Sequence, residues 1–341
     1  MWIILPFIAI AAMRVVQTIC GKQVSNSVSS GEMFFRYGTF YQFVAALLSL
    51  ITLAITGFYG FNLPTVLCSL VSAVLFGIEL FTSIEVLKGC SMTVATMFGL
   101  GGLIISCVLS IFCFNEPMSI FQVLGLALFF VGVYLLTPSK TEKSQRINLK
   151  TYILLFINLL TNGFVMVAQK YFSALSEGML TFMQYPKSSY SVATYSFLTF
   201  ILNALILLVC ALVLYAKRKK KRNALAAQTA IEVESTQTKP TTQKSEKAML
   251  FGLTKTHLIC GSLLALAVFV INYLVTELGK TVPSVILFPV SSAISIALSA
   301  LIGWLLYKEK LTAKNFIGLF VGLLGIIAIG VLTTTTIANW F

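Results

Sequence analysis

Apolar segments of about 20 residues recur along almost the whole chain, and a single long polar stretch interrupts them. An α-helix of about that length is needed to cross the hydrocarbon core of a bilayer. Of the 341 residues, 58% are hydrophobic and only 10% are charged, whereas a soluble domain carries roughly a quarter charged residues. The sequence therefore predicts an all-α integral membrane protein and excludes a soluble domain that carries a single anchor.

The apolar segments predict ten transmembrane helices. Several prolines lie at the proposed ends, where a missing amide hydrogen costs least, namely Pro64, Pro117, Pro138, Pro186 and Pro283. The expected helices cover residues 1–20, 34–57, 64–87, 91–113, 119–137, 150–171, 190–216, 256–279, 282–306 and 311–332.

A glutamate that is followed by glycines nine and sixteen residues later occurs twice in the chain. The two copies are Glu116, Gly125 and Gly132, and Glu309, Gly318 and Gly325. Chance is one explanation, because small residues are favoured wherever membrane helices touch. We interpret the spacing as duplication of a five-helix unit, with copies at 1–139 and 150–335. Since five is odd, the copies are inverted, as they are in many secondary transporters.

The match extends upstream of these motifs. Glu85 and Lys88 end the third expected helix as Glu277 and Lys280 end the eighth, and residues 14–22 can be laid on residues 162–170. The two Glu/Lys pairs are separated by three residues, which favours local solvated ion pairs at the helix ends. Glu116 and Glu309 precede expected helices, where a carboxylate caps the helix N-terminus.

The repeated unit resembles the ten-helix, EamA-like branch of the drug/metabolite transporter superfamily. The likeness is carried by Phe114-Asn-Glu116-Pro, Tyr307-Lys-Glu309-Lys, Phe35-Arg36-Tyr37 and Leu87-Lys88. This resemblance implies an inverted bundle in which helices one to four and six to nine surround a central cavity. It also implies peripheral fifth and tenth helices and transport of small metabolites or drugs. The long basic loop between helices seven and eight departs from the family.

Basic residues mark one side of the expected bundle. Apart from Lys170, Lys187 and Lys280, the Lys and Arg residues belong to the odd-numbered connections or to the helix ends beside them. Because basic loops resist translocation, this predicts a plasma-membrane protein with both termini outside and a disordered, cytoplasmic loop at 217–255. Characterised members of the family are commonly drawn with cytoplasmic termini instead. The basic run at 217–222 lacks interleaved aromatics, so we expect contact with anionic lipids and not with nucleic acid.

The ionisable residues argue against an enzyme. All eleven acidic residues are Glu, and His257 is the single histidine, so the sequence offers neither paired aspartates nor a histidine-rich metal centre. The seven cysteines show no CxxC spacing and are interpreted as small buried apolar residues. We expect no metal and no cofactor. For the oligomeric state, the sequence allows both a monomer and a homodimer.

Glu79 is the most conspicuous candidate for a functional residue, because an ionisable group at membrane depth costs at least about 2.5 kcal/mol. The second copy has no equivalent charge, since Ile271 and Asn272 occupy the aligned position. Glu79 would bind substrate or couple transport to protons, or it would pair with Arg14 and hold two helices together. Arg14 and Gln17 could donate to a carboxylate or phosphate, unless Arg14 extends to the membrane surface.

Other candidates are polar or adaptable side chains on the fourth, sixth, eighth and ninth expected helices. Pro289 and the serines near it predict a broken ninth helix that lines the cavity. Contacts that simply hold helices together are an equally good interpretation of the asparagines. The full set of expected substrate-binding residues is Arg14, Gln17, Glu79, Thr82, Ser83, Thr96, Met97, Asn162, Asn272, Tyr273, Phe288 and Ser292.

These features favour a secondary transporter that moves a small organic solute by alternating access, with protons as a possible second cargo on Glu79. A lipid-carrier flippase and a channel of the same architecture are the alternatives. A channel is disfavoured because the sequence has no filter-like loop. An embedded enzyme would lack an evident general base.

Overall fold

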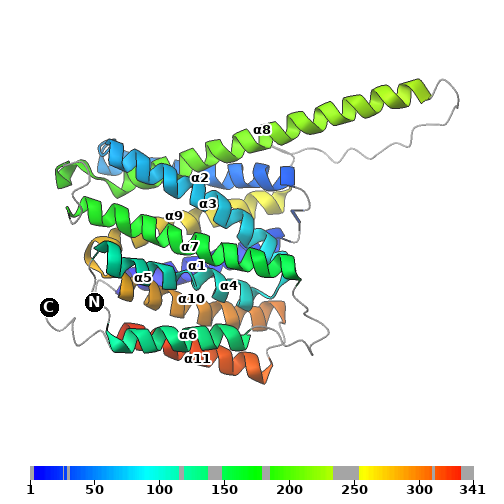
Figure 1. Ribbon diagram of the computed structural model, residues 1–341. Helices are drawn as coiled ribbons and strands as arrows, with labels where there is room; N and C mark the ends of the chain where they lie inside the picture. Colours follow the sequence, from blue (N-terminus) through cyan, green and yellow to red (C-terminus); the bar gives the residue numbers. More distant parts are fainter. Residues whose placement is uncertain are drawn as a thin grey trace.

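The chain folds into a bundle of long helices that run side by side (Figure 1). The computed structural model describes residues 4–25, 27–28, 31–114, 119–136, 148–178, 185–232, 253–308 and 312–331, and within these ranges it contains no β-strand. The helices are α1 Ile4–Ser25, α2 Gly31–Thr56, α3 Leu63–Gly89, α4 Met92–Leu100, α5 Leu103–Phe114, α6 Ile120–Leu136, α7 Leu149–Ser176, η1 Lys187–Ser189, α8 Val192–Glu232, α9 Lys255–Thr281, α10 Ser284–Tyr307 and α11 Ala313–Val331.

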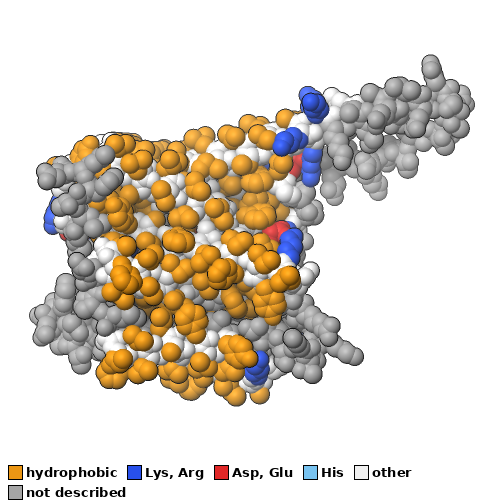
Figure 2. Space-filling view, in the orientation of Figure 1, with side chains coloured by type: hydrophobic (Ala, Val, Ile, Leu, Met, Phe, Trp, Pro, Cys, Tyr) orange, Lys and Arg blue, Asp and Glu red, His pale blue; other side chains and the backbone are white. Residues whose placement is uncertain are grey.

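The described helices have the length and composition of membrane spans. Eight of the segments are long and apolar enough to cross a bilayer, with α4 and α5 together forming one of them. Shorter apolar stretches, Val123–Gly132 and Ala313–Gly325, lie in α6 and α11. Apolar side chains cover the flank of the bundle, and Lys and Arg gather mainly at one end (Figure 2). The all-α membrane prediction is therefore confirmed, whereas ten crossings stay a prediction.

We call the end of the bundle at which Lys and Arg gather the basic end. Several contacts lie there. The last turn of α1 meets the last turn of α3, where Lys22 Nζ donates to Leu87 O at 2.8 Å. The start of α2 meets α8, where Arg218 donates to Glu32 at 2.8 Å. Arg36 completes this cluster with an ion pair to Glu32. The ends of α1 and α3 and the start of α2 therefore lie at the basic end, together with Arg218 of α8.

Helix packing follows a reciprocal pattern. Helix α1 packs on α9 and α7 packs on α3, while α2 pairs with α8 and α6 pairs with α11. In the last pair, a Cβ added to Gly132 would lie 2.7 Å from Gly318 O, and a Cβ added to Gly325 would lie 2.6 Å from Gly125 O. The glycines of the two motifs therefore let α6 and α11 touch through their backbones. Glu116 and Glu309 themselves lie outside the described residues.

The fourth expected helix is interrupted where the sequence places two adjacent glycines. Helix α4 ends at Leu100 and α5 begins at Leu103, with Gly101 and Gly102 in the turn between them. A Cβ on Gly102 would lie 2.4 Å from the backbone nitrogen of Gly163 in α7, so no other residue fits there without a shift. The break lets α5 approach α7 at backbone distance.

The ninth expected helix differs from its prediction. Helix α10 is continuous from Ser284 to Tyr307 with Pro289 inside it, so the expected break is absent from this helix. Proline removes one amide hydrogen, and two nearby serines bond to backbone oxygens within the helix: Ser291 to Phe288 O at 3.0 Å and Ser295 to Ser291 O at 2.7 Å. The prediction of a broken α10 was wrong, and the glycine pair of α4 and α5 carries the break instead.

The prediction for the polar segment after the seventh expected helix was also partly wrong. Helix α8 runs for 41 residues to Glu232, so residues 217–232 are helical and not a disordered loop. A helix of that length measures about 60 Å, about twice the hydrocarbon thickness, and Figure 1 shows α8 projecting past the other helices. The rest of the expected loop, 233–252, lies outside the described residues, as do Pro117 and Pro138.

The cysteines form no disulfides in the structure, and His257 takes part in capping a helix. All seven cysteines are free thiols, and Cys20, Cys107 and Cys260 are buried among apolar side chains. His257 caps the start of α9 together with Thr254 and contacts Ser27 Oγ at 2.9 Å. Within the described ranges, no three metal-ligating side chains come together.

Candidate functional site

A cavity of about 110 Å³ lies inside the bundle, in the halves of α1, α2, α3, α7 and α9 that are nearer the basic end and beside α4. Six helices contribute to it: α1, α2, α3, α4, α7 and α9. The lining residues with polar groups are Arg14, Gln17, Thr18, Tyr37, Tyr41, Glu79, Ser83, Thr96, Asn158 and Asn162. The cavity lining includes Gly21 and Leu87, so the cavity reaches to within about one turn of the ends of α1 and α3.

Arg14 lies near the middle of α1, about 15 Å from either end of the helix. Its Nη1 donates to Gln17 Oε1 at 3.1 Å, one turn further along the same face. A guanidinium carries five N–H donors, and among the described residues this amide is the one acceptor that it reaches. The remaining donors border the cavity, so Arg14 is placed to bind an anionic group.

Glu79 lies on α3 and is 7% exposed. Its Oε1 accepts from Asn162 Nδ2 of α7 at 3.1 Å, and no other described residue donates to the carboxylate. Asn162 sits at the middle of α7, so this contact lies deep in the bundle. The amide orients the carboxylate, and Arg14 attracts it without touching it, so Glu79 can still contact a cation or a proton.

Arg14 and Glu79 line the same cavity but form no ion pair with each other: among the described residues, every N–O approach of 4.0 Å or less involves other partners. A direct ion pair between α1 and α3 is therefore not formed in this conformation, although the two charges lie close enough to attract each other. Each charge instead has one amide neighbour, Gln17 for Arg14 and Asn162 for Glu79.

A second asparagine fixes the wall between α3 and α7. Asn158 Nδ2 donates to Thr82 Oγ1 at 2.9 Å and to Ser83 Oγ at 2.8 Å. On its other side, a Cβ added to Gly99 of α4 would lie 2.9 Å from Asn158 Oδ1. Asn158 is thus held by three helices, and it gives the cavity a rigid polar corner.

A smaller cavity of about 20 Å³ continues from the same residues towards the other end of the bundle. It shares Arg14, Glu79 and Asn162 with the larger one and adds Gln169 and Asn272. Gln169 Nε2 donates to Asn272 Oδ1 at 2.6 Å, and Asn272 Nδ2 donates to Ser196 Oγ at 3.2 Å. These amides satisfy each other, so they join α7, α8 and α9 and close this end of the site.

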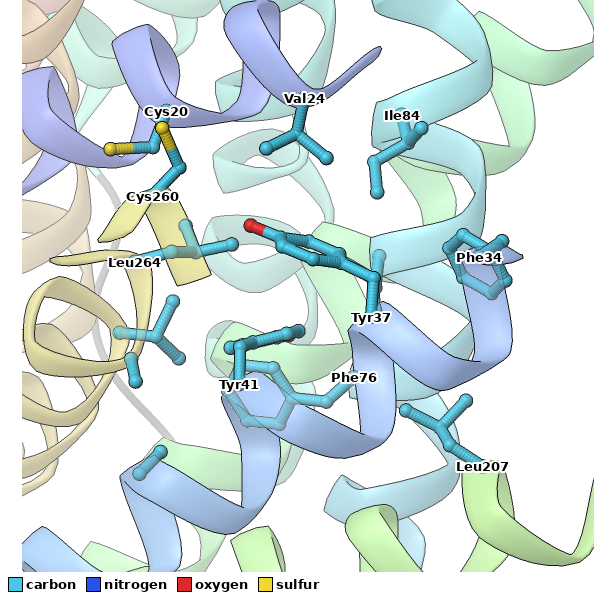
Figure 3. Packing of buried hydrophobic residues seen from close by; sticks show 14 of the residues in the cluster. Cys20, Val24, Phe34, Tyr37, Tyr41, Phe76, Ile84, Leu207, Cys260 and Leu264 are labelled. Carbon is cyan, nitrogen blue, oxygen red and sulfur yellow. The ribbon is translucent and has the colours of Figure 1, made fainter. Parts of the chain in front are cut away.

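Aromatic side chains of α2 and α3 form the opposite wall. Figure 3 shows Tyr37 and Tyr41 one turn apart on α2, with Phe76 of α3 beside them. The hydroxyl of Tyr37 points towards the helices that carry Cys20 and Cys260 and has no hydrogen-bond partner among the described residues. An unpartnered buried hydroxyl on a cavity wall is costly unless a ligand or water completes it.

Beyond the site, apolar side chains fill the bundle towards the other end. Phe7 and Ile10 of α1 pack with Val275 of α9 and with Leu287 and Phe288 of α10. All five side chains are at most 9% exposed. The cavity therefore reaches towards the basic end and is shut on the opposite side.

The structure brings together most of the expected binding residues. Arg14, Gln17, Glu79, Ser83, Thr96 and Asn162 line the larger cavity, and Asn272 lines the smaller one. Thr82 stands one layer behind, where it accepts from Asn158.

Four expected residues lie elsewhere. Met97 and Phe288 belong to the apolar packing around α10. Ser292 is buried on α10 and Tyr273 packs against Phe269 at 6.0 Å between ring centroids. Because α10 is not broken, its side chains pack against neighbours and do not reach the cavity.

Sequence reasoning missed Tyr37, Tyr41, Asn158 and Gln169. A signal was present for Asn158, which precedes the identified Asn162 by one helical turn. The two tyrosines share the same spacing of four residues. Polar side chains one turn apart on a membrane helix are therefore the pattern that could have identified this wall.

Comparisons with known proteins inform the fold alone. No family model and no curated protein matches the chain. A solved structure described only as "Crystal structure of protein" is similar to it, with a TM-score of 0.58 and 10% sequence identity, over 96% of this chain and 98% of that one. The architecture of the whole chain therefore has a counterpart among solved structures, and that description names no activity.

Proposed function

We propose that this chain is a secondary transporter that moves a small organic metabolite or drug across the membrane by alternating access. The observation that carries the proposal is the cavity around Arg14 and Glu79. Charged groups at membrane depth are costly, and in membrane proteins they mark substrate and ion pathways. Here two of them border an internal space within helices of membrane length.

The shape of the cavity supports alternating access. It extends towards the basic end, while Phe7, Ile10 and Phe288 belong to the packed apolar cluster on the other side. A channel would need a continuous path that the apolar packing interrupts. A transporter, in contrast, is expected to have one side closed whenever the other is accessible.

Two lysines support the duplication that such transporters contain. Lys22 Nζ donates to Leu87 O and Cys90 O at the end of α3, at 2.8 and 3.2 Å. Lys170 Nζ donates to Gly279 O and Val282 O at the end of α9, at 3.0 and 3.2 Å. In each case a lysine late in one helix caps another helix on two carbonyls three residues apart. The reciprocal contacts of α6 and α11 agree with ten spans arranged as two inverted sets of five.

Glu79 is the proposed coupling residue. Its carboxylate is buried, is bonded to one neutral amide and faces the cavity. A carboxylate in this setting can exchange a proton when the cavity fills or empties, since Arg14 attracts it from a distance and forms no direct ion pair with it. Proton movement would then accompany substrate movement.

Uptake into proteoliposomes tests the proposal. Purified protein is reconstituted, the vesicles are preloaded with unlabelled solute mixtures, and exchange of labelled amino acids, organic anions, cationic drugs, sugars and nucleobases is measured. We expect saturable exchange of one solute class, and we expect Lys187→Met to leave it unchanged because Lys187 is exposed and far from the cavity lining. Vesicles that exchange no class above protein-free vesicles, or that show single-channel currents, would overturn the proposal.

A further inference from the structure

The charges on the cavity wall constrain the substrate more closely than the proposed function does. Arg14 contributes a cation and Glu79 an anion, and both face one space of about 110 Å³. The two charges lie close enough to attract each other but form no direct ion pair, and their described hydrogen-bond partners are the amides of Gln17 and Asn162. A charge away from water that has no direct ionic contact is unfavourable, so a solute that contacts each charge should stabilise the site.

Solutes of different charge satisfy this site to different degrees. A neutral solute leaves both charges without a direct ionic contact. A monoanion can pair with Arg14 but adds a repulsion with Glu79, and a monocation does the reverse. A solute that carries both an anionic and a cationic group can pair with both side chains at once.

The size and chemistry of the walls limit the solute further. The cavity volume suits a molecule about as large as an amino acid, and a nucleotide or a large drug would require it to widen. The side chains of Thr96 and Asn158 add neutral polar groups to the lining. Phe76, Leu80 and Val268 offer an apolar surface on which a side group can rest.

We infer that the cavity binds a small zwitterion of the amino-acid class, with its carboxylate on Arg14 and its ammonium group on Glu79. This inference rests on the proposed function and specifies the substrate class of the same site. Arg14 and Glu79 then have opposite roles in the same cavity, so substitution of either residue alone tests its role.

A charge-switch experiment tests the inference. The thermal stability of the purified protein is measured with each standard amino acid and with its N-acetyl and methyl-ester derivatives, which are an anion and a cation of the same skeleton. A ligand that binds the folded state raises the unfolding temperature. For the unmodified chain we expect stabilisation by a zwitterion and roughly tenfold to hundredfold weaker binding of both derivatives.

The variants should reverse this preference. In Glu79→Gln the cation partner is lost, so the N-acetyl derivative should bind better than the parent amino acid. In Arg14→Gln the methyl ester should bind better instead, and Arg14→Lys should retain the original order if Arg14→Gln fails to fold. Equal stabilisation by all three charge forms, or by none of the amino acids, would overturn the inference. Exchange of sugars or cationic drugs in the vesicle experiment would then keep the transport proposal while excluding this substrate class.

Discussion

Arg14 and Glu79 line one cavity from neighbouring helices, yet the guanidinium bonds to Gln17 and the carboxylate bonds to Asn162. A structural ion pair would have consumed both charges. The two opposite charges attract each other but make no direct contact, so both remain open to a ligand, and charges at membrane depth are costly to maintain. The cost indicates that the site is built for something that enters it.

Glu79→Gln should abolish or uncouple transport while the protein stays folded. Glutamine has nearly the same shape, and its amide oxygen can still accept from Asn162, so the packing of α3 on α7 is retained. The change removes the titratable group. Solute exchange and proton uptake are measured in the same vesicles, with the unfolding temperature as a check on folding. Full activity with unchanged proton movement would exclude Glu79 as the coupling residue.

Removing either capping lysine should destabilise the protein. Lys170→Met and Lys22→Met each leave two helix-end carbonyls without their charged donor, and we expect a loss of about 1–3 kcal/mol for each. Lys170 should be the costlier of the two, because it is 4% exposed. Chemical denaturation in detergent gives the free energies of unfolding.

The matched control for the capping lysines is Lys187→Met. Its side chain is 67% exposed and 3.6 Å from Glu177, so the pair should contribute at most about 1 kcal/mol. If the control lowers stability as much as Lys170→Met does, the capping bonds are not the cause.

Gly102→Ala should disrupt the contact between α5 and α7. The added methyl group would meet the backbone of Gly163 at 2.4 Å, and backbone cannot rotate away as a side chain can. Overpacking of this kind costs about 1–3 kcal/mol. Gly31→Ala is the control, since nothing lies within 4 Å of its added Cβ. A decrease in the unfolding temperature for Gly102→Ala alone supports the close approach, and equal effects of both substitutions would refute it.

The orientation of the bundle can be read from two single cysteines. In a chain without its native cysteines, Lys219→Cys lies on the exposed part of α8 at the basic end, and Lys187→Cys lies at the opposite end. The positive-inside rule predicts that a membrane-impermeant maleimide added to intact cells labels position 187 and not position 219. The reverse labelling would place the termini in the cytoplasm, as commonly drawn for the family that the sequence resembles.

Much of the helical architecture could be predicted from the sequence, because length and apolarity alone decide which segments can cross a bilayer. The expected local ion pairs also form, between Lys88 and Glu85 and between Lys280 and Glu277. Helix ends were less predictable. Basic residues favour solvent but do not break a helix, so α8 continues through the run that was expected to be a loop.

The charged and amide residues of the candidate site could be predicted from the sequence. The residues whose position depends on helix packing could not. Arg14, Glu79 and Asn162 could be found because such groups are rare in membrane helices. Met97 and Phe288 lie in the apolar packing beside the cavity, and the sequence cannot separate the two positions because apolar residues line cavities and fill cores equally well. The direction in which a residue such as Phe288 faces depends on its helix packing, which the sequence alone did not supply.

Alternating access is the central claim, and the accessibility of two cysteine reporters tests it without knowledge of the substrate. Thr96→Cys faces the cavity near the basic end, and Ile10→Cys is 0% exposed in the packing at the other end. Each is placed in a cysteine-free chain and labelled in vesicles with an impermeant reagent added on one side. We predict that Thr96→Cys reacts from the basic side and Ile10→Cys from the opposite side, and that modification of either one suppresses exchange. Complete protection of Ile10→Cys over hours, in a protein that still exchanges solute, would contradict the account.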